Sequence, residues 1–183
     1  MSSQPKYLSG LPLVLLTMAL SLAVFMEVLD TTIANVALPH IAGDLGAATS
    51  QGTWVITSFA VANAISVPLT GWVARRFGEV RLFLTAVLMF VITSWLCGIA
   101  HNLTALILFR TLQGLFTGPL IPLSQSLLLA AYPPHRRHLA LAFWGMTVIT
   151  APILGPIIGG YISDRVQWGW IFFINVPIGI LAF

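Results

Sequence analysis

The sequence predicts an all-α membrane protein, a bundle of six helices of which the last is incomplete. Hydrophobic residues make up 58% of the 183-residue chain and charged residues only 7%, whereas a soluble domain carries about 25% charged residues. Long apolar runs, close to the ~20 residues that span a bilayer, alternate with short polar connections. Within one transmembrane bundle of residues 1–183, the expected helices cover 12–38, 52–74, 82–100, 103–131, 139–162 and, incomplete, 168–183.

The same composition argues against several classes of function. Cys97 is the single cysteine, and the four histidines lie in three separate connections, so we expect neither an intrachain disulfide nor a metal site. The eight basic residues are scattered along the chain, which argues against a nucleic-acid partner. Because the sequence shows no pairing of a nucleophile with a base, we expect a protein that is not an enzyme and that needs no cofactor.

The first apolar run, 12–38, carries two acids, Glu27 and Asp30. An acid in hydrocarbon costs roughly 2.5–3.5 kcal/mol at mid-helix, so such acids mostly face a cavity or a partner and often mark ion pathways. At about 100° per residue, both acids share one face with Thr31 and Asn35, which we expect to line the pathway. The alternative is that Asp30 only holds a neighbouring helix. The opposite face is expected to meet lipid and comprises Phe25, Val28, Leu29 and Val36.

Prolines mark expected ends and bends of the first two helices and of the last. We expect Pro39 to end the first helix and Pro68 to kink the second, because proline lacks the amide hydrogen that a helix needs. The last run starts near Trp168, contains Pro177 and is still apolar where the chain stops. We therefore expect the sixth helix to be cut short.

The fourth apolar run, 103–131, combines charge with helix-breaking residues. Arg110 and Gln113 lie one turn apart in its first half. Gly118, Pro119 and Pro122 follow, and the two prolines predict a broken or bent helix whose freed carbonyl groups need other partners.

The positions of the basic residues predict the orientation of the chain in the membrane. The first and third connections contain no lysine or arginine. Because basic connections face the cytoplasm, we expect the N-terminus and the second and fourth connections to be cytoplasmic. The residues that support this are Lys6, then Arg75, Arg76 and Arg81, then Arg136 and Arg137.

Two segments of the chain are similar to each other. GWVARRFGEV at 71–80 aligns with GYISDRVQWG at 160–169, and the helices expected to start near 12 and 103 have a similar spacing. Since three helices separate the copies, the second copy must be inverted relative to the first. Two inverted three-helix repeats are typical of one half of a secondary transporter. The alternative is a chance similarity between two polar connections.

Five segments in order resemble the signatures of drug:proton antiporters in the major facilitator superfamily, and more narrowly the fourteen-span EmrB/QacA family. The segments are LDTTIANVALP at 29–39, GWVARRFGEVR at 71–81, RTLQG at 110–114, GPIIGG at 155–160 and WGWIFFINVPIG at 168–179. The first resembles the signature of helix 1 and the second resembles that of the connection between helices 2 and 3. The third and fourth resemble the signatures of helices 4 and 5, and the fifth is similar to the EmrB/QacA family.

The resemblance implies the N-terminal six-helix half of a major facilitator fold, located in the bacterial inner membrane. It implies multidrug efflux, the export of hydrophobic drug-like molecules in exchange for protons, with the proton gradient in place of a cofactor. A periplasmic adaptor and an outer-membrane duct are the implied partners. Two other interpretations remain: a nutrient transporter of the same fold, and a membrane scaffold or inactive fragment.

The acids and the arginine are the candidate site for proton coupling. At 1.5 Å per residue, Asp30 and Arg110 both lie roughly 12–13 Å below the outer membrane surface, so we expect them to form a charge pair, with Gln113 offering a hydrogen bond. Glu27 lies about a turn deeper without an evident cation and is the residue expected to take up a proton. The alternative is a static structural pair.

The two glycine-containing signatures have expected structural roles. Gly71 and Gly78 suit a tight turn, and Arg76 and Arg81 complete that signature. Arg75 replaces the usual aspartate, and Glu79 stands where a basic residue is common, so the charge lock expected at this connection is either swapped or missing. In the fifth helix, glycines leave one face without side chains, and we expect the backbone of a neighbouring helix to approach that face closely. That antiporter signature consists of Gly155, Pro156, Gly159 and Gly160.

Overall fold

The computed structural model describes residues 8–183, so the orientation signal from Lys6 lies outside the described residues. Five of the helical segments are long and apolar enough to cross a membrane, and a shorter apolar segment follows them. The elements are α1 (Leu11–Asp44), α2 (Thr49–Gly52), α3 (Trp54–Phe77), α4 (Glu79–Gly98), α5 (Leu103–Thr117), α6 (Leu120–Ala131), the 3-10 turn η1 (Pro134–Arg136), α7 (Arg137–Arg165), α8 (Trp170–Phe173) and α9 (Asn175–Ala182).

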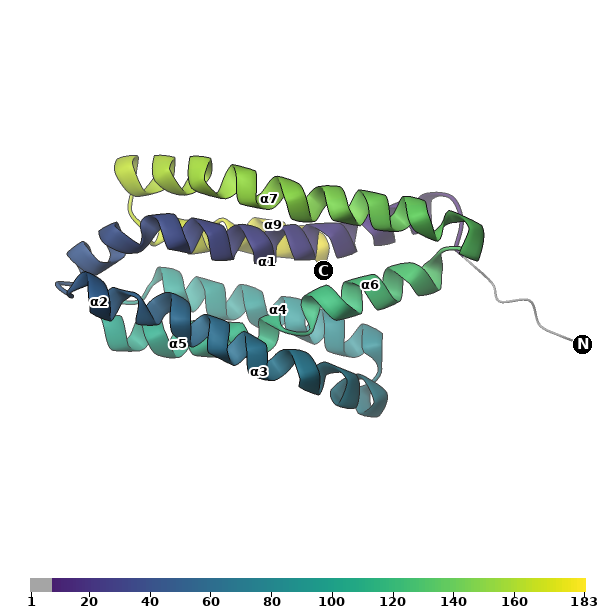
Figure 1. Cartoon of the computed structure of the whole chain (residues 1–183), viewed down its shortest axis with the longest axis horizontal. Coiled ribbons are helices and arrows are strands. Elements are labelled where there is room, and N and C mark those ends of the chain that lie inside the picture. Colours follow the sequence, from purple (N-terminus) through teal and green to yellow (C-terminus); the bar gives the residue numbers. More distant parts are fainter. Residues whose placement is uncertain (1–7) are drawn as a thin grey trace, which may run out of the picture.

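The long helices lie side by side in one bundle (Figure 1). The strongest helix pairings are α1 with α7 and α3 with α5. The first helix of each half of the described chain thus packs on the second helix of the other half. A similar exchange joins α1 to α9 and α5 to α4. These reciprocal pairings are what two inverted three-helix repeats require.

The connections gather at the two ends of the bundle (Figure 1). The start of α1, the α3–α4 turn and η1 lie at one end, while α2 and the α4–α5 connection lie at the other. The basic connections therefore share one end. At the other end, the His40 Nε2 and Asp164 Oδ1 atoms approach to 3.3 Å and join the ends of α1 and α7.

The first helix does not end at Pro39 as predicted but continues to Asp44. Proline removes one backbone hydrogen bond, here to the carbonyl of Asn35, four residues earlier. Both Pro39 and Asn35 are exposed. The freed carbonyl therefore lies on the open side of the helix, and its loss of a partner does not stop the helix.

The predicted connection 75–81 is also wrong, because helix occupies nearly all of it. α3 continues through Phe77 and α4 begins at Glu79. The turn consists of Gly78 alone, with φ at 90°, in the left-handed region that favours glycine. Gly71 was predicted to belong to the turn but lies inside α3.

The predicted break in the fourth run is confirmed, since α5 ends at Thr117 and α6 begins at Leu120. Asn102 explains where α5 begins, because its side chain accepts a hydrogen bond from the Ala105 amide at 2.8 Å and caps the helix. At the break, a Cβ on Gly118 would overlap the Ser66 side chain of α3. The glycine lets the bend in the chain pack closely against α3.

The face of α1 that was predicted to meet lipid is mostly covered. Leu29 is 1% exposed, Phe25 and Val28 are half-buried, and Val36 alone is exposed at 37%. The prediction failed because α7 and α9 both pack on α1, so the helix has neighbours on its apolar side as well as its polar side. Lipid would instead contact other helices of the bundle, for which Leu108, Ile149 and Ile157 are exposed examples.

Candidate functional site

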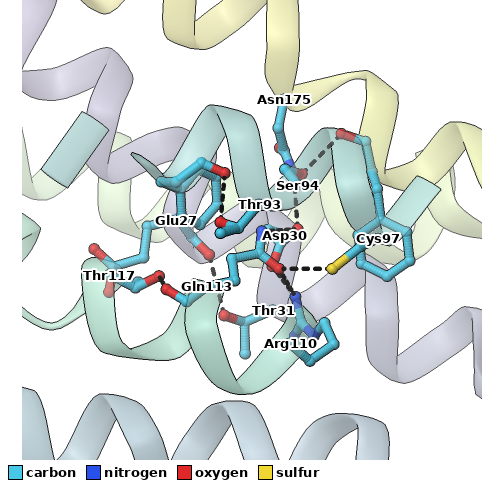
Figure 2. A network of polar contacts seen from close by, with 12 residues as sticks. Glu27, Asp30, Thr31, Thr93, Ser94, Cys97, Arg110, Gln113, Thr117 and Asn175 are labelled. Atoms are coloured by element: carbon cyan, nitrogen blue, oxygen red, sulfur yellow. Dashed lines mark hydrogen bonds and ion pairs between the residues drawn. The ribbon is translucent and has the colours of Figure 1, made fainter. Parts of the chain in front are cut away.

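An ion pair between Asp30 of α1 and Arg110 of α5 lies at the centre of the candidate site (Figure 2). The Arg110 Nη1 atom is 2.5 Å from Asp30 Oδ2, and each side chain is 1% exposed. The contact expected from the shared depth of the two residues is therefore present. Its role in proton coupling stays a prediction.

Arg110 has further partners that compensate for burying its charge. Its Nη1 donates to Gln113 Oε1 at 2.7 Å and its Nε donates to the Val55 carbonyl at 3.4 Å. The guanidinium carbon lies 4.1 Å from the centre of the Phe59 ring and 5.5 Å from that of Phe172, which adds cation–π attraction. A buried charge needs such surroundings, because removing either member of a buried pair leaves the other uncompensated.

Asp30 receives two more hydrogen bonds on its other oxygen. Gln113 Nε2 donates to Asp30 Oδ1 at 3.3 Å, and Asn175 Nδ2 donates to the same atom at 2.7 Å (Figure 2). Asp30 thus faces an arginine and two amides from α5 and α9. An ionised carboxylate can accept all three bonds, since it carries acceptor sites only.

Sequence reasoning did not identify Asn175 or Ser94 as site residues. Ser94 Oγ of α4 accepts from Asn175 Nδ2 at 2.9 Å and donates to the Phe172 carbonyl at 2.9 Å. The available signal was a lone amide in the apolar run of the last helix. Nothing in the sequence places that run beside Asp30, because the proximity arises from the packing of α9 on α1.

Glu27 lies one turn from Asp30 on α1 and is 5% exposed. Its Oε2 atom is buried without a hydrogen-bond partner within residues 8–183, and Asn63 of α3 lies close to its carboxyl group. No ion pair involves Glu27 among the described residues. Its role as a proton acceptor stays a prediction.

Thr31 and Asn35, predicted to line the pathway, extend from the acids toward the open side of α1. Thr31 is half-buried and its Oγ1 donates to the Glu27 carbonyl at 3.0 Å. Asn35 is exposed, and its Nδ2 donates to the Thr31 carbonyl at 2.8 Å. Neither side chain hydrogen-bonds the Asp30–Arg110 pair.

The antiporter signature packs α7 against α1. A Cβ on Gly155 would overlap the Thr32 side chain, and one on Gly159 would lie 3.3 Å from Ile33 Cα. These two glycines therefore provide the close backbone approach that was expected of them. Gly160 meets nothing within 4 Å, and Pro156 is exposed, so half of the signature faces away from α1.

The charged signature at the α3–α4 turn is separate from the buried pair. Glu79 Oε2 accepts a hydrogen bond from Ser126 Oγ of α6 at 2.8 Å. Among the described residues, Arg75, Arg76 and Arg81 form no ion pair with an acid. The swapped Arg75–Glu79 lock is therefore not formed in this conformation. A cavity of about 330 Å³ lies here, with Arg75, Glu79 and Ser126 on its wall.

No set of three side chains suited to bind a metal ion occurs within residues 8–183. Two acids, one arginine and several neutral hydrogen-bonding groups gather in an apolar interior. In membrane proteins, buried ionisable groups of this kind often mark a pathway for ions or substrates.

Known proteins resemble the chain both in sequence and in structure. It is 70% identical to multidrug export protein EmrB of Haemophilus influenzae over 94% of this chain and 34% of that protein. It is 69% identical to fatty acid resistance protein FarB of Neisseria gonorrhoeae over 96% of this chain and 34% of that protein. The chain thus spans about a third of the length of these curated relatives.

The fold is that of solved transporters. A crystal structure of a mutant peptide transporter POT in complex with sulfate superimposes with a TM-score of 0.82, at 19% identity, over 97% of this chain and 38% of that one. Residues 20–183 match the family described as the Major Facilitator Superfamily. The described helices are those of one half of that fold, with a broken fourth span and a short sixth. The chain is a multi-pass membrane protein that belongs to the Major Facilitator Superfamily.

Proposed function

We propose that the chain is the N-terminal half-fold of a multidrug exporter that exchanges hydrophobic drug-like molecules for protons. The observation that carries this proposal is the buried Asp30–Arg110 pair with Glu27, an acid lacking a hydrogen-bond partner on one oxygen, a single turn away. Burying three ionisable groups in a membrane bundle is costly, and transporters accept this cost where protons or ions pass. The relatives named as multidrug export proteins support export as the direction of transport.

In the proposed mechanism, Glu27 takes up a proton and Asp30 with Arg110 sets the electric field around it. The ionised pair holds α1 and α5 together, and the half-buried and exposed polar groups of Thr31 and Asn35 lead from Glu27 to the open side of α1. Binding a proton neutralises one acid in this interior. The electrostatic attraction and repulsion between α1 and the neighbouring helices then change. A proton-driven cycle needs such a change, because a proton shifts the equilibrium between two conformations only if it binds one of them better.

The proposed substrates are hydrophobic, and one groove of the described surface suits such molecules. It has a volume of about 370 Å³ and lies between α1 and α7. Four hydroxyl groups and apolar side chains share its wall, so it offers hydrogen bonds to a largely apolar ligand. Its residues are Val14, Thr17, Met18, Ser21, Tyr132, Phe143 and Thr147.

The remaining parts of the proposal concern location and partners. We place the protein in the bacterial inner membrane because of its similarity to bacterial EmrB proteins. We place its N-terminus in the cytoplasm because the basic connections share one end of the bundle. The similarity to EmrB supports a periplasmic adaptor and an outer-membrane duct as partners. The same similarity favours export over nutrient uptake and over a scaffold without transport.

The test is drug efflux from a pump-deficient strain that expresses the complete transporter with single substitutions. Asp30→Asn removes the charge that Arg110 pairs with, and we expect efflux to fall to background. Glu27→Gln fixes a neutral side chain, so we expect the pH dependence of efflux to flatten. The matched control is Asp44→Asn, the same substitution at an exposed acid of α1. If both test variants reach the membrane and export drug with an unchanged pH profile, proton coupling does not occur at this site.

A further inference from the structure

We infer that Asn175 is a positioning residue for the proton-coupling site: together with Ser94 it holds Asp30 ionised and paired with Arg110, and it joins the last helix to that pair. This inference rests on the proposed function, in which Asp30 takes part in proton coupling. It adds a role for a helix that sequence reasoning did not connect to the site.

The geometry joins four helices through three hydrogen bonds. Asn175 is the first residue of α9 and is 0% exposed. Its Nδ2 donates to Asp30 Oδ1 of α1 at 2.7 Å and to Ser94 Oγ of α4 at 2.9 Å. Ser94 Oγ in turn donates to the Phe172 carbonyl of α8 at 2.9 Å. A displacement of α9 therefore changes a hydrogen bond of the acid directly, and a displacement of α8 acts on it through Ser94 and Asn175.

The direction of the Asn175 hydrogen bond favours the ionised acid. An ionised carboxylate only accepts hydrogen bonds, whereas a protonated one must also donate. The amide nitrogen of Asn175 can donate but cannot accept, so it stabilises Asp30 best when that acid carries its negative charge. Gln113 Nε2 donates to the same oxygen at a longer distance of 3.3 Å.

The amide oxygen of Asn175 indicates that this residue does not serve packing alone. Its Oδ1 is buried and has no hydrogen-bond partner within residues 8–183. A buried polar atom without a partner destabilises a fold, and leucine would occupy a similar volume without that cost. The donor side of the amide is therefore the part that the site uses.

Asn175 can be replaced without changing any of the charged or titratable groups around Asp30. They are Arg110 of α5, Cys97 of α4 and, one turn away on α1, Glu27. From α9, Asn175 contributes a neutral donor. Replacing it changes one hydrogen bond to the acid while every charge in the site is kept.

The experiment compares wild type with Asn175→Leu in the complete transporter, purified and reconstituted. The infrared band of a protonated carboxyl group that is absent in Asp30→Asn reports the protonation of Asp30. Losing a hydrogen bond to a charged group should raise the pH at which this band is half-formed by about one unit, or tenfold in proton affinity. We expect the pH midpoint of efflux to move in the same direction.

Two further variants secure the interpretation. Ser94→Ala removes the second partner of Asn175 while keeping the packing, and a smaller shift in the same direction is expected. If the Asn175→Leu protein does not fold, Ser94→Ala serves as the test variant in its place. Ser124→Ala is the matched control, because Ser124 is buried and hydrogen-bonded to Trp144 Nε1 at 3.0 Å but lies outside the site. We expect no shift from it.

The outcomes separate this inference from the proposed function. An unchanged infrared midpoint in both Asn175→Leu and Ser94→Ala overturns the positioning role, even if efflux is proton-driven. A shifted midpoint in a protein whose efflux ignores the proton gradient keeps the positioning role and overturns the proposed function. A fall in protein stability without a shift in the midpoint assigns Asn175 to packing alone and also overturns the inference.

Discussion

At the scale of single residues, Arg110 is a fully buried charge with several different partners. The side chain is fully buried and meets an acid, an amide oxygen, a backbone carbonyl and two aromatic rings. Its effect on stability depends on whether its partner is present. Breaking a buried pair by removing one member typically costs about 3–5 kcal/mol, whereas replacing both members with apolar groups is often nearly neutral.

We therefore predict strong coupling between substitutions at positions 30 and 110. Arg110→Met should lower the free energy of unfolding by about 3–5 kcal/mol, because it leaves Asp30 buried without its cation. In the double variant with Asp30→Leu, the loss should be smaller than the sum of the two single losses by at least ~1 kcal/mol. Chemical unfolding of the purified proteins in detergent measures this. Additive losses would show that the two residues do not stabilise each other.

At the scale of helices, the contact between α1 and α7 depends on two glycines spaced one turn apart. Gly155 and Gly159 lie against Thr32 and Ile33, whereas Gly160 meets nothing within 4 Å. Membrane helices associate through this kind of close backbone packing, because lipid provides little hydrophobic driving force between them. Residues of the same signature thus contribute differently to the interface.

We predict that alanine at position 155 impairs the transporter and that alanine at position 160 does not. Alanine favours a helix interior over glycine by about 1 kcal/mol at either site. At 155, however, the added Cβ would overlap Thr32 and push α7 away from α1. Efflux and membrane abundance of the two variants, measured side by side, test this. Equal behaviour of the two variants would contradict the assigned contact.

At the scale of the whole molecule, alternate connections lie at opposite ends of the bundle (Figure 1). The end that holds the α3–α4 turn and η1 also holds the arginines Arg75, Arg76, Arg81, Arg136 and Arg137. The opposite end has acids and histidines, with Arg165 as its one basic residue among those described. This asymmetry is the basis for the proposed orientation.

We predict that single cysteines at Gly46 and Asn102 react with an impermeant thiol reagent added to intact cells. A cysteine at His135 should react only after the membrane is opened. The control is the protein with Cys97 as its sole cysteine, which is buried and should not react. Labelling of position 135 in intact cells would reverse the orientation.

The sequence determined much of the architecture and part of the site. Length and hydropathy located the apolar runs, Pro119 and Pro122 predicted a break or bend in the fourth run, and the depth of Asp30 and Arg110 predicted their contact. These features follow from local chemistry. An apolar run must span the bilayer, a proline removes a donor, and a buried charge needs a partner.

Only the tertiary structure decided which helices surround the site. The sequence predicted a lipid-facing side for α1, but α7 and α9 cover Leu29. It gave no reason to place Asn175 and Ser94 beside Asp30, since those residues are far apart along the chain and meet only when α9 packs on α1 and α4. Helix periodicity fixes which residues share a face. Which partner meets that face depends on the packing of all the helices together, because every apolar surface in a membrane bundle can meet either lipid or another helix.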